Sequence, residues 1–344
     1  MPVTIKDIAR AAGVSHATVS RALNGNAAIP EGTAESIRDL ARSMGYVPSA
    51  AARGLKTNRS KVLGVIVSRI DNPYFGEVVQ GIEDVVKEEG YSIFLASSDQ
   101  GREQERSVVQ AFGEHRVDGA IIGSVSFTPE HLALLKEYHV PIVVLNNQSP
   151  EEFTNSISHD DIYGGEEVTR YLLSLGHKRV AYIGNNRAGR INHDRLTGYR
   201  KALAAAGIKP DADLVVNTAG SDIDDGIEGM SMLMKQGRLP DAVFCFNDLM
   251  AIGALKLLQK EGIRVPQQLS LAGFDNIEYS AYTSPALTTF DQPKRLIGSE
   301  AARLLLSLIG NGEYRDSLGT PTHLVRGRLL IRESTAHFHA QEEK

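Results

Sequence analysis

The chain has 344 residues, more than one ordinary hydrophobic core organises, so its length predicts two or three domains. Its 42% hydrophobic and 23% charged residues are typical of globular proteins. It contains one cysteine, Cys245, no leader-like N-terminus and no apolar run of about eighteen residues. We therefore expect no internal disulfide, no membrane contact and a cytoplasmic location.

The net charge of −5 is unevenly distributed along the chain. Residues 1–60 carry eight Lys and Arg against four Asp and Glu, a charge of +4 that leaves −9 for the rest. A basic segment on an acidic chain suggests that this segment meets a polyanion such as DNA. A merely solvated surface gives the same pattern, and charge alone does not separate the two readings.

Three short helices are predicted in the first 45 residues. Thr4 and the acid three residues later form a pair that caps a helix start, and apolar residues then recur at helical spacing until Gly13. Ser15 can cap a second helix. The third begins near Pro30 and stops at Gly45. Together they predict a small bundle.

The first two helices have the spacing of a helix-turn-helix motif, with Ala9 at the helix crossing, Gly13 at the turn and Val19 packing back. The outer side of the second helix would then lie in the major groove of DNA, where Arg21 can donate two hydrogen bonds to guanine. An ordinary helical hairpin with a polar surface is the alternative. We favour a DNA-binding domain over residues 1–47, with Thr4, Ser15, His16, Ala17, Thr18, Arg21 and Asn24 as its contact residues.

The two stretches TIKDIARAAGVSHATVSRALNG and GYVPSAAARGLKTNRSKVLGVIV resemble the LacI/GalR family of bacterial transcription regulators. The resemblance runs from Thr4 to about Ser334. It implies a three-helix DNA-binding domain, a hinge helix, and a two-lobed body like that of periplasmic sugar-binding proteins.

Residues 48–60 would join head and body. Judged by its own residues this alanine-rich stretch is a plain linker, too short to be a stable helix alone and weakened by Gly54. The resemblance implies instead a hinge helix that enters the minor groove, with Leu55 as an apolar wedge between base pairs and Ala52 and Lys56 beside it.

From Lys61 to about residue 340, β-rich runs alternate with amphipathic helices, which predicts doubly wound parallel sheets. KVLGVIV and KRVAYIG begin two similar series, so we expect two lobes. The first would hold residues 61–160 and 291–321, and the second residues 161–290 and 322–340, with crossings near 160, 290 and 322. The resemblance implies that this body binds an effector and dimerises.

Ligands of such folds bind in the cleft beyond the carboxyl ends of the strands. Amides, aromatic rings, a carboxylate and arginines follow these strands, a set that suits a polyhydroxyl ligand. Single members have plainer readings as helix caps or core residues. The predicted effector-binding residues, most of which match family positions, are Asn72, Tyr74, Phe75, Asn146, Asn147, Arg190, Arg195, Asn247, Asp275 and Gln292.

Two departures from the family pattern leave the ligand's identity open. Asn146-Asn147 stands where many sugar binders carry Asp-Arg, and Gly220 is near the position where some relatives present an aromatic lid. Arg69, Arg187 and Arg190 near the cleft would suit an anionic ligand. A sugar is our first expectation, with a sugar acid or a nucleoside as alternatives.

Enzymatic readings find no support in the motifs. The sequence has no phosphate-binding glycine loop, no HExxH and no GxSxG. His159-Asp160-Asp161 suggests acid–base or metal chemistry, but three adjacent residues do not converge on one ion, so we favour a role in a crossing segment. We therefore expect no enzyme, no metal and no cofactor other than a small-molecule effector.

The sequence thus predicts a cytoplasmic, nucleoid-associated transcriptional regulator, most simply a repressor. It would bind a palindromic operator as a homodimer and change its operator affinity when a sugar closes the cleft. The C-terminus has no leucine heptads that would add a tetramerisation coil. Alternatives are a global catabolite regulator with a phosphocarrier protein as co-effector, a metabolic enzyme with a fused DNA-binding head, and a sugar-binding protein without a DNA role.

Overall fold

The computed structural model describes residues 3–47, 59–98, 101–124, 127–146, 155–310 and 323–338. The chain divides into two compact units, residues 1–60 and 61–344. The predicted hinge positions Ala52, Leu55 and Lys56 lie outside the described residues, as does Asn147.

The first unit is a bundle of three helices, α1 (Ile5–Ala12), α2 (His16–Leu23) and α3 (Glu31–Ser43). Its core has small residues where the helices meet and larger ones between them, namely Ile8, Ala9, Val19, Ala22, Ala34, Ile37 and Ala41. Gly13 ends α1 with a φ of 67°, a left-handed conformation that glycine adopts without strain. The motif residues Ala9, Gly13 and Val19 therefore have the roles that their spacing predicted.

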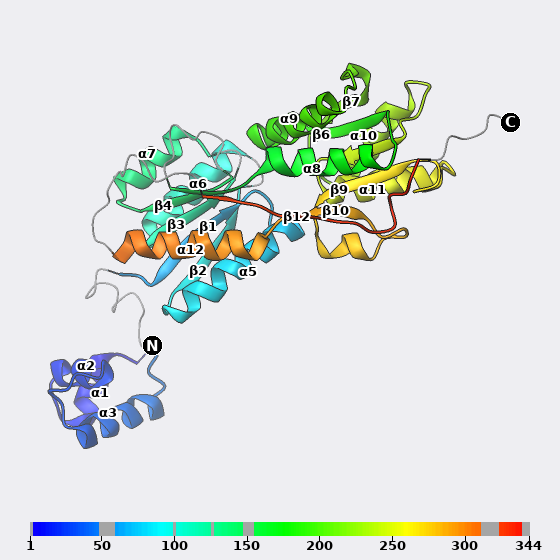
Figure 1. The fold of residues 1–344 in the computed structure, drawn as a ribbon. Coiled ribbons are helices and arrows are strands. Elements are labelled where there is room, and N and C mark those ends of the chain that lie inside the picture. Colours follow the sequence, from blue (N-terminus) through cyan, green and yellow to red (C-terminus); the bar gives the residue numbers. More distant parts are fainter. Residues whose placement is uncertain are drawn as a thin grey trace. The chain divides into compact units, whose positions relative to one another are not determined.

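The first lobe of the body is a parallel six-stranded sheet in the order β11-β5-β4-β3-β1-β2, covered by helices on both faces (Figure 1). Buried side chains of α5 and α12 pack on one face and those of α6 and α7 on the other. Its strands are β1 (Val62–Val67), β2 (Ser92–Ser97), β3 (Gly119–Gly123), β4 (Ile142–Leu145), β5 (Ser156–His159) and β11 (His323–Val325). Its helices are α5 (Pro73–Glu88), α6 (Arg102–Glu114), α7 (Pro129–Glu137) and α12 (Lys294–Gly310).

The second lobe repeats this plan with the strand order β12-β10-β9-β8-β6-β7, in which β10 and β12 are antiparallel and the other pairs parallel. Its strands are β6 (Val180–Asn185), β7 (Val215–Thr218), β8 (Ala242–Cys245), β9 (Ser270–Asp275), β10 (Thr288–Asp291) and β12 (Arg328–Leu330). Its helices are α8 (Asp161–Ser174), α9 (Arg190–Ala205), α10 (Ile223–Met234) and α11 (Asp248–Lys260), with the short 3-10 turns η1 (Asn186–Ala188), η2 (Ala212–Leu214) and η3 (Glu278–Ala281).

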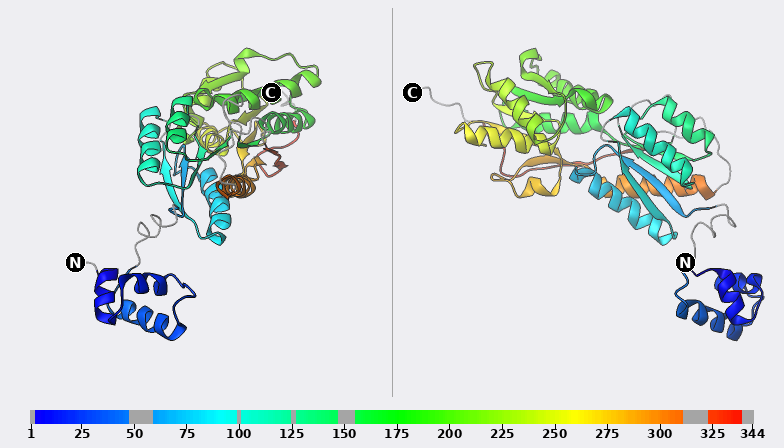
Figure 2. Two further views of the ribbon diagram at one scale, coloured as in Figure 1. Left: turned by 90° about the vertical axis from the view of Figure 1, so that its left-hand side faces the viewer. Right: turned by 180° about the vertical axis from the view of Figure 1, so that it is seen from behind.

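The chain crosses between the lobes three times (Figures 1 and 2). The first crossing leaves β5 for α8 near residue 160, and the second leaves β10 for α12 after residue 291. The third comes between Val325 and Arg328 rather than near 322, because β11 pairs with β5 and so still belongs to the first lobe. The first lobe therefore extends to residue 325, beyond the predicted 321.

Helices α5 and α12 cross with their backbones almost in contact. A Cβ atom on Gly81 would lie 2.1 Å from the carbonyl oxygen of Arg295, and one on Gly298 would lie 2.0 Å from that of Val78. Both positions therefore require glycine. At the far end of α5, Lys61 donates from Nζ to the carbonyl of Glu89 at 3.1 Å, which joins the start of the body to this helix.

Candidate DNA-reading surface and ligand cleft

Two of the predicted DNA-contact residues serve as helix caps. Thr4 accepts from the amide of Asp7 at 3.4 Å, and Ser15 accepts from the amide of Thr18 at 3.1 Å. The Ser15 and Thr18 hydroxyls are 2.9 Å apart. These bonds satisfy free amides at the helix starts and fix the angle at which α2 follows the turn.

The remaining predicted residues of α2 are on its outer side. His16 and Arg21 are exposed and Ala17 is half-buried, whereas Val19 and Ala22 face the core. Asn24 caps the end of α2, with its side-chain amide donating to the carbonyl of Ser20 at 2.6 Å. The bundle thus presents an exposed imidazole and an exposed guanidinium on one helix, groups that can reach base edges or phosphates.

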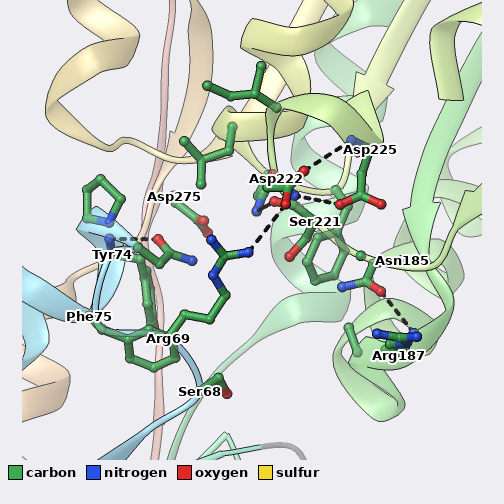
Figure 3. A pocket seen from close by; sticks show the side chains of 18 of the residues that line it. Ser68, Arg69, Tyr74, Phe75, Asn185, Arg187, Ser221, Asp222, Asp225 and Asp275 are labelled. Atoms are coloured by element: carbon green, nitrogen blue, oxygen red, sulfur yellow. Dashed lines mark hydrogen bonds and ion pairs between the residues drawn. The ribbon is translucent and has the colours of Figure 1, made fainter. Parts of the chain in front are cut away.

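A cavity of about 730 Å³ lies between the lobes of the body at the carboxyl ends of their strands (Figure 3). Its size suits a small metabolite. Eight of the ten predicted effector residues line it, namely Asn72, Tyr74, Phe75, Asn146, Arg195, Asn247, Asp275 and Gln292.

Arg190 is not among the lining residues. It begins α9 with an exposed side chain, and its Nε lies 3.2 Å from Asp194 one turn further along the same helix. Arg187 in η1 lines the cleft instead. The structure therefore places Arg190 outside the cleft lining, at the exposed start of α9.

Two of the cleft amides cap helices, which for Asn247 was the plainer reading of the sequence. Asn72 accepts from the amide of Tyr74 at 3.0 Å at the start of α5. Asn247 accepts from the amide of Met250 at 2.9 Å at the start of α11, and it donates to the carbonyl of Ser221 at 2.9 Å. Asn247 therefore also holds the 219–222 loop that forms part of the cleft wall.

The floor of the cleft is a hydrogen-bonded chain that joins the two lobes. Asn146 donates to the Tyr74 hydroxyl at 3.3 Å, and this hydroxyl donates to the side-chain oxygen of Gln292 at 3.5 Å. Gln292 in turn donates to Asp275 at 2.6 Å. A ligand that bonds to groups at both ends of this chain would contact both lobes.

Arg195 is a buried cation fixed by the second lobe. Its Nε donates to Asp161 at 2.7 Å, its Nη1 donates to the carbonyl of Phe246, and its Nη2 lies 3.9 Å from Asp275. The guanidinium stacks over the ring of Phe274 at 3.9 Å. Burial alone would raise the pKa of Asp161, but the charge of Arg195 and the bonds around it outweigh burial and lower that pKa.

Asp275 has an unusual backbone for a residue other than glycine, with a φ of 109°. Lys294 stabilises it by donating from its buried ammonium to the carbonyls of Asp275 at 2.6 Å and Asn276 at 2.9 Å. Burial raises the pKa of Asp275 to about 6, although Arg195 and Lys294 oppose this rise.

A second buried acid, Asp248, lies beneath the cleft at the start of α11. It accepts from the Thr289 hydroxyl at 2.6 Å and from the amide of Ile277 at 2.9 Å. Burial first, and the charge of Asp275 second, raise the pKa of Asp248 to about 8. Its carboxyl is therefore mostly protonated at neutral pH.

Several lining residues escaped the sequence reasoning, namely Ser68, Asn185, Ser221, Asp222, Asp225, Phe246 and Tyr279. Asn185 and Phe246 stand at strand ends, so the rule that found the other residues applies to them as well. Residues 221–225 begin α10, and Tyr279 belongs to η3. No pattern in the sequence marks these last positions as part of a cleft. Gly220 does line the cleft.

The cluster His159-Asp160-Asp161 stands at the first crossing. Asp160 caps α8 and pairs with Arg326 of the third crossing at 2.9 Å, while Asp161 holds Arg195. His159 is buried against the ring of Phe290, 5.4 Å between centroids. Within the described ranges, no group of three acidic, histidine or cysteine side chains is placed to hold a metal ion. None of the described helices combines the length and apolarity needed for a membrane crossing.

Comparison with known families gives two matches along the chain. Residues 4–49 match the family described as bacterial regulatory proteins of the lacI family, and residues 169–335 match a periplasmic binding protein-like domain. The HTH-type transcriptional repressor PurR of Vibrio atlanticus is 34% identical over 312 residues, which cover 90% of this chain and 93% of that protein. PurR of Pasteurella multocida is 35% identical over 89% of this chain and 92% of its own length.

Solved structures agree with these matches. A lac repressor dimer bound to operator and the anti-inducer ONPF has a TM-score of 0.86 at 26% identity, over 98% of this chain and 100% of that one. A complex of the regulator CelR with cellobiose has a TM-score of 0.71 at 29% identity, over 96% and 99%. A LacI family regulator from Enterococcus faecium with bound ribose has a TM-score of 0.72 at 28% identity, over 81% and 100%. The chain therefore belongs to the LacI/GalR family of bacterial transcription regulators, and it is a DNA-binding transcriptional repressor rather than an enzyme.

Proposed function

We propose that the protein represses transcription as a homodimer on a near-palindromic operator, and that an uncharged polyhydroxyl metabolite, a sugar, changes its operator affinity by binding in the cleft. One observation carries the proposal. Hydrogen-bonding groups of both lobes converge on one floor, from Asn146 and Tyr74 on one side to Gln292 and Asp275 on the other. A ligand bonded there shifts one lobe against the other.

The charges of the cleft favour an uncharged ligand over a sugar acid. Five aspartates and three arginines are among its lining residues. Arg69 pairs with Asp71 and Asp222, and Arg195 is held by two further buried carboxylates. At Arg69 or Arg195 an anionic ligand would have to displace a carboxylate, and at Arg187 it would still meet the five lining aspartates. Hydroxyl groups, by contrast, can donate to carboxylates and accept from arginines or amides.

The relatives support the same proposal. The lac repressor structure is described as a dimer on its operator, and two similar regulators were solved with cellobiose or ribose. For this chain we infer, in the same way, a dimer that places two copies of α2 on two half-sites. Such a protein acts on the nucleoid in the cytoplasm, with its effector as the one small molecule it requires.

The proposal is tested on the full chain in two steps. Footprinting on genomic fragments should reveal a protected element with two-fold symmetry, and recovery of none would contradict the operator proposal. A thermal-shift screen of sugars, sugar acids and nucleosides should then raise the melting temperature with a neutral sugar, because a ligand stabilises the state that binds it. A hit confined to sugar acids or nucleosides would contradict the proposed ligand class.

An Asp275→Asn variant links the two steps. It keeps the size of the side chain but removes the charge that faces the cleft. Operator binding without effector should persist. The apparent affinity for the hit compound, measured by thermal shift, should fall at least about tenfold, as expected for the loss of a charged hydrogen bond. A variant that responds like the wild type would show that the effector binds elsewhere.

A further inference from the structure

An ion pair links the two lobes at one side of the cleft. Arg69, in the loop after β1, and Asp222, at the start of α10, approach with Nη1 and Oδ2 3.3 Å apart (Figure 3). Both residues line the cavity, and neither belongs to a crossing segment. Their side chains retain 39% and 43% of their exposure, so solvent and salt reach the pair.

The arginine is oriented by its own lobe. The Asp71 carboxylate accepts hydrogen bonds from Nε of Arg69 at 2.9 Å and from its Nη2 at 2.6 Å. This bidentate contact fixes the plane of the guanidinium. Nη1 is left to extend toward the other lobe. Closing the cleft therefore costs Arg69 little additional side-chain entropy.

The aspartate is oriented by the other lobe in the same way. Its Oδ1 accepts from the amides of Asp224 at 3.0 Å and Asp225 at 3.2 Å, and its own amide donates to Asp225 at 3.0 Å. This capping box holds the carboxylate of Asp222 at the first turn of α10. Its second oxygen, Oδ2, is directed at Arg69 (Figure 3).

We propose that Arg69 and Asp222 form an interlobe latch, which uses only groups of the chain to favour the closed cleft and so sets how readily the effector enters and leaves. Both partners are held in place before they meet, which is what a contact that must form and break repeatedly requires. A half-exposed pair of this kind changes the ratio of closed to open cleft by about two- to fivefold. The latch itself is a property of the body alone. Only its effect on the entry and exit of an effector rests on the proposed function.

The test measures the interlobe distance in the full chain without DNA or added metabolite. Spin labels are attached through Glu103→Cys and Asn186→Cys, two exposed positions at the strand-end edges of the two lobes, while the native Cys245 is buried and does not react. Arg69→Gln and Asp222→Asn should each shift the distance distribution toward the open form. Asp222→Asn keeps an oxygen that can cap α10.

Two comparisons separate a latch from a general effect of charge. Arg295→Gln removes an equally long ion pair, 3.3 Å to Asp84, that lies within the first lobe, and it should leave the distribution unchanged. The double variant Arg69→Gln with Asp222→Asn should be no more open than either single variant, because both changes remove the same contact. Raising NaCl from about 50 to about 500 mM should open the wild type and leave the double variant as it was.

Distances that match the wild type in both single variants, or effects that add in the double variant, would overturn the proposal. A missing response to every sugar would instead contradict the proposed function and leave these distances unaffected. The two failures are therefore distinguishable.

Discussion

The buried carboxyl of Asp248 makes the stability of the protein depend on pH in a direction opposite to that of most acids. Its pKa rises from 3.8 in an exposed chain to about 8 in the fold. A group whose pKa is raised by folding contributes its full stability below pH 3.8 and loses it as the pH rises toward 8. At pH 7 folding must protonate this carboxyl, which costs about 1.4 kcal/mol for each pH unit above 3.8, or about 4 kcal/mol.

An Asp248→Asn variant removes this cost and should be more stable than the wild type at neutral pH. The amide keeps an oxygen that accepts from the amide of Ile277, and its N–H can donate to the Thr289 hydroxyl once that hydroxyl rotates from donating to accepting. We expect a gain in the free energy of unfolding of about 3–4 kcal/mol at pH 7 and about 1–2 kcal/mol at pH 5.

Urea unfolding followed by far-UV circular dichroism measures these gains, since the chain has no tryptophan for fluorescence. Asp84→Asn is the control, because Asp84 is an aspartate with a side chain 60% exposed and its replacement should change the free energy of unfolding only slightly. Equal gains at pH 5 and pH 7, or a variant less stable than the wild type at pH 7, would refute the reasoning.

Three further variants test other parts of the fold. Arg195→Met leaves its buried carboxylates unpaired and should lower the free energy of unfolding by about 3–5 kcal/mol in urea titrations; a loss below about 1 kcal/mol would mean that the pair adds little. Gly298→Ala places a Cβ against the carbonyl of Val78, so the melting temperature should fall, whereas alanine at the exposed Gly310 should be tolerated. Ser15→Ala removes the cap of α2, which should cost about 1 kcal/mol and weaken operator binding in gel-shift assays; unchanged binding would exclude a role for the cap in docking.

The fold was largely predictable because its strong signals are local. Strands β1 and β6 coincide closely with the runs KVLGVIV and KRVAYIG that predicted the two lobes, since buried parallel strands have continuous apolar runs. The short strands β5, β7, β11 and β12 have no such run in the sequence. They have three or four residues each. Ser156–His159 forms a strand because it pairs with β4 and β11, and its own sequence has no strand pattern. The third crossing was predicted too early for the same reason, because the sequence does not reveal that β11 pairs with β5.

The candidate site was predictable where it follows a strand and not where it depends on a loop. Tyr74, Asn146, Asp275 and Gln292 converge because parallel strands end at one edge of a sheet. Arg190 was expected at the cleft but starts α9 outside the lining, whereas Arg187 of the preceding 3-10 turn is part of it. The ion pair between Arg69 and Asp222 joins residues 153 positions apart, and no local pattern predicts such a contact.

The contact between α5 and α12 has a mechanical consequence. Because main-chain atoms meet at Gly81 and Gly298, neither helix can slide past the other without a collision of backbones. Helix α5 begins at Pro73, next to Asn72 of the cleft wall, and its 16 residues extend for about 24 Å toward Glu89, whose carbonyl accepts a hydrogen bond from Lys61. We therefore expect a tilt of this helix at the cleft to be felt at Lys61, the first residue of the body.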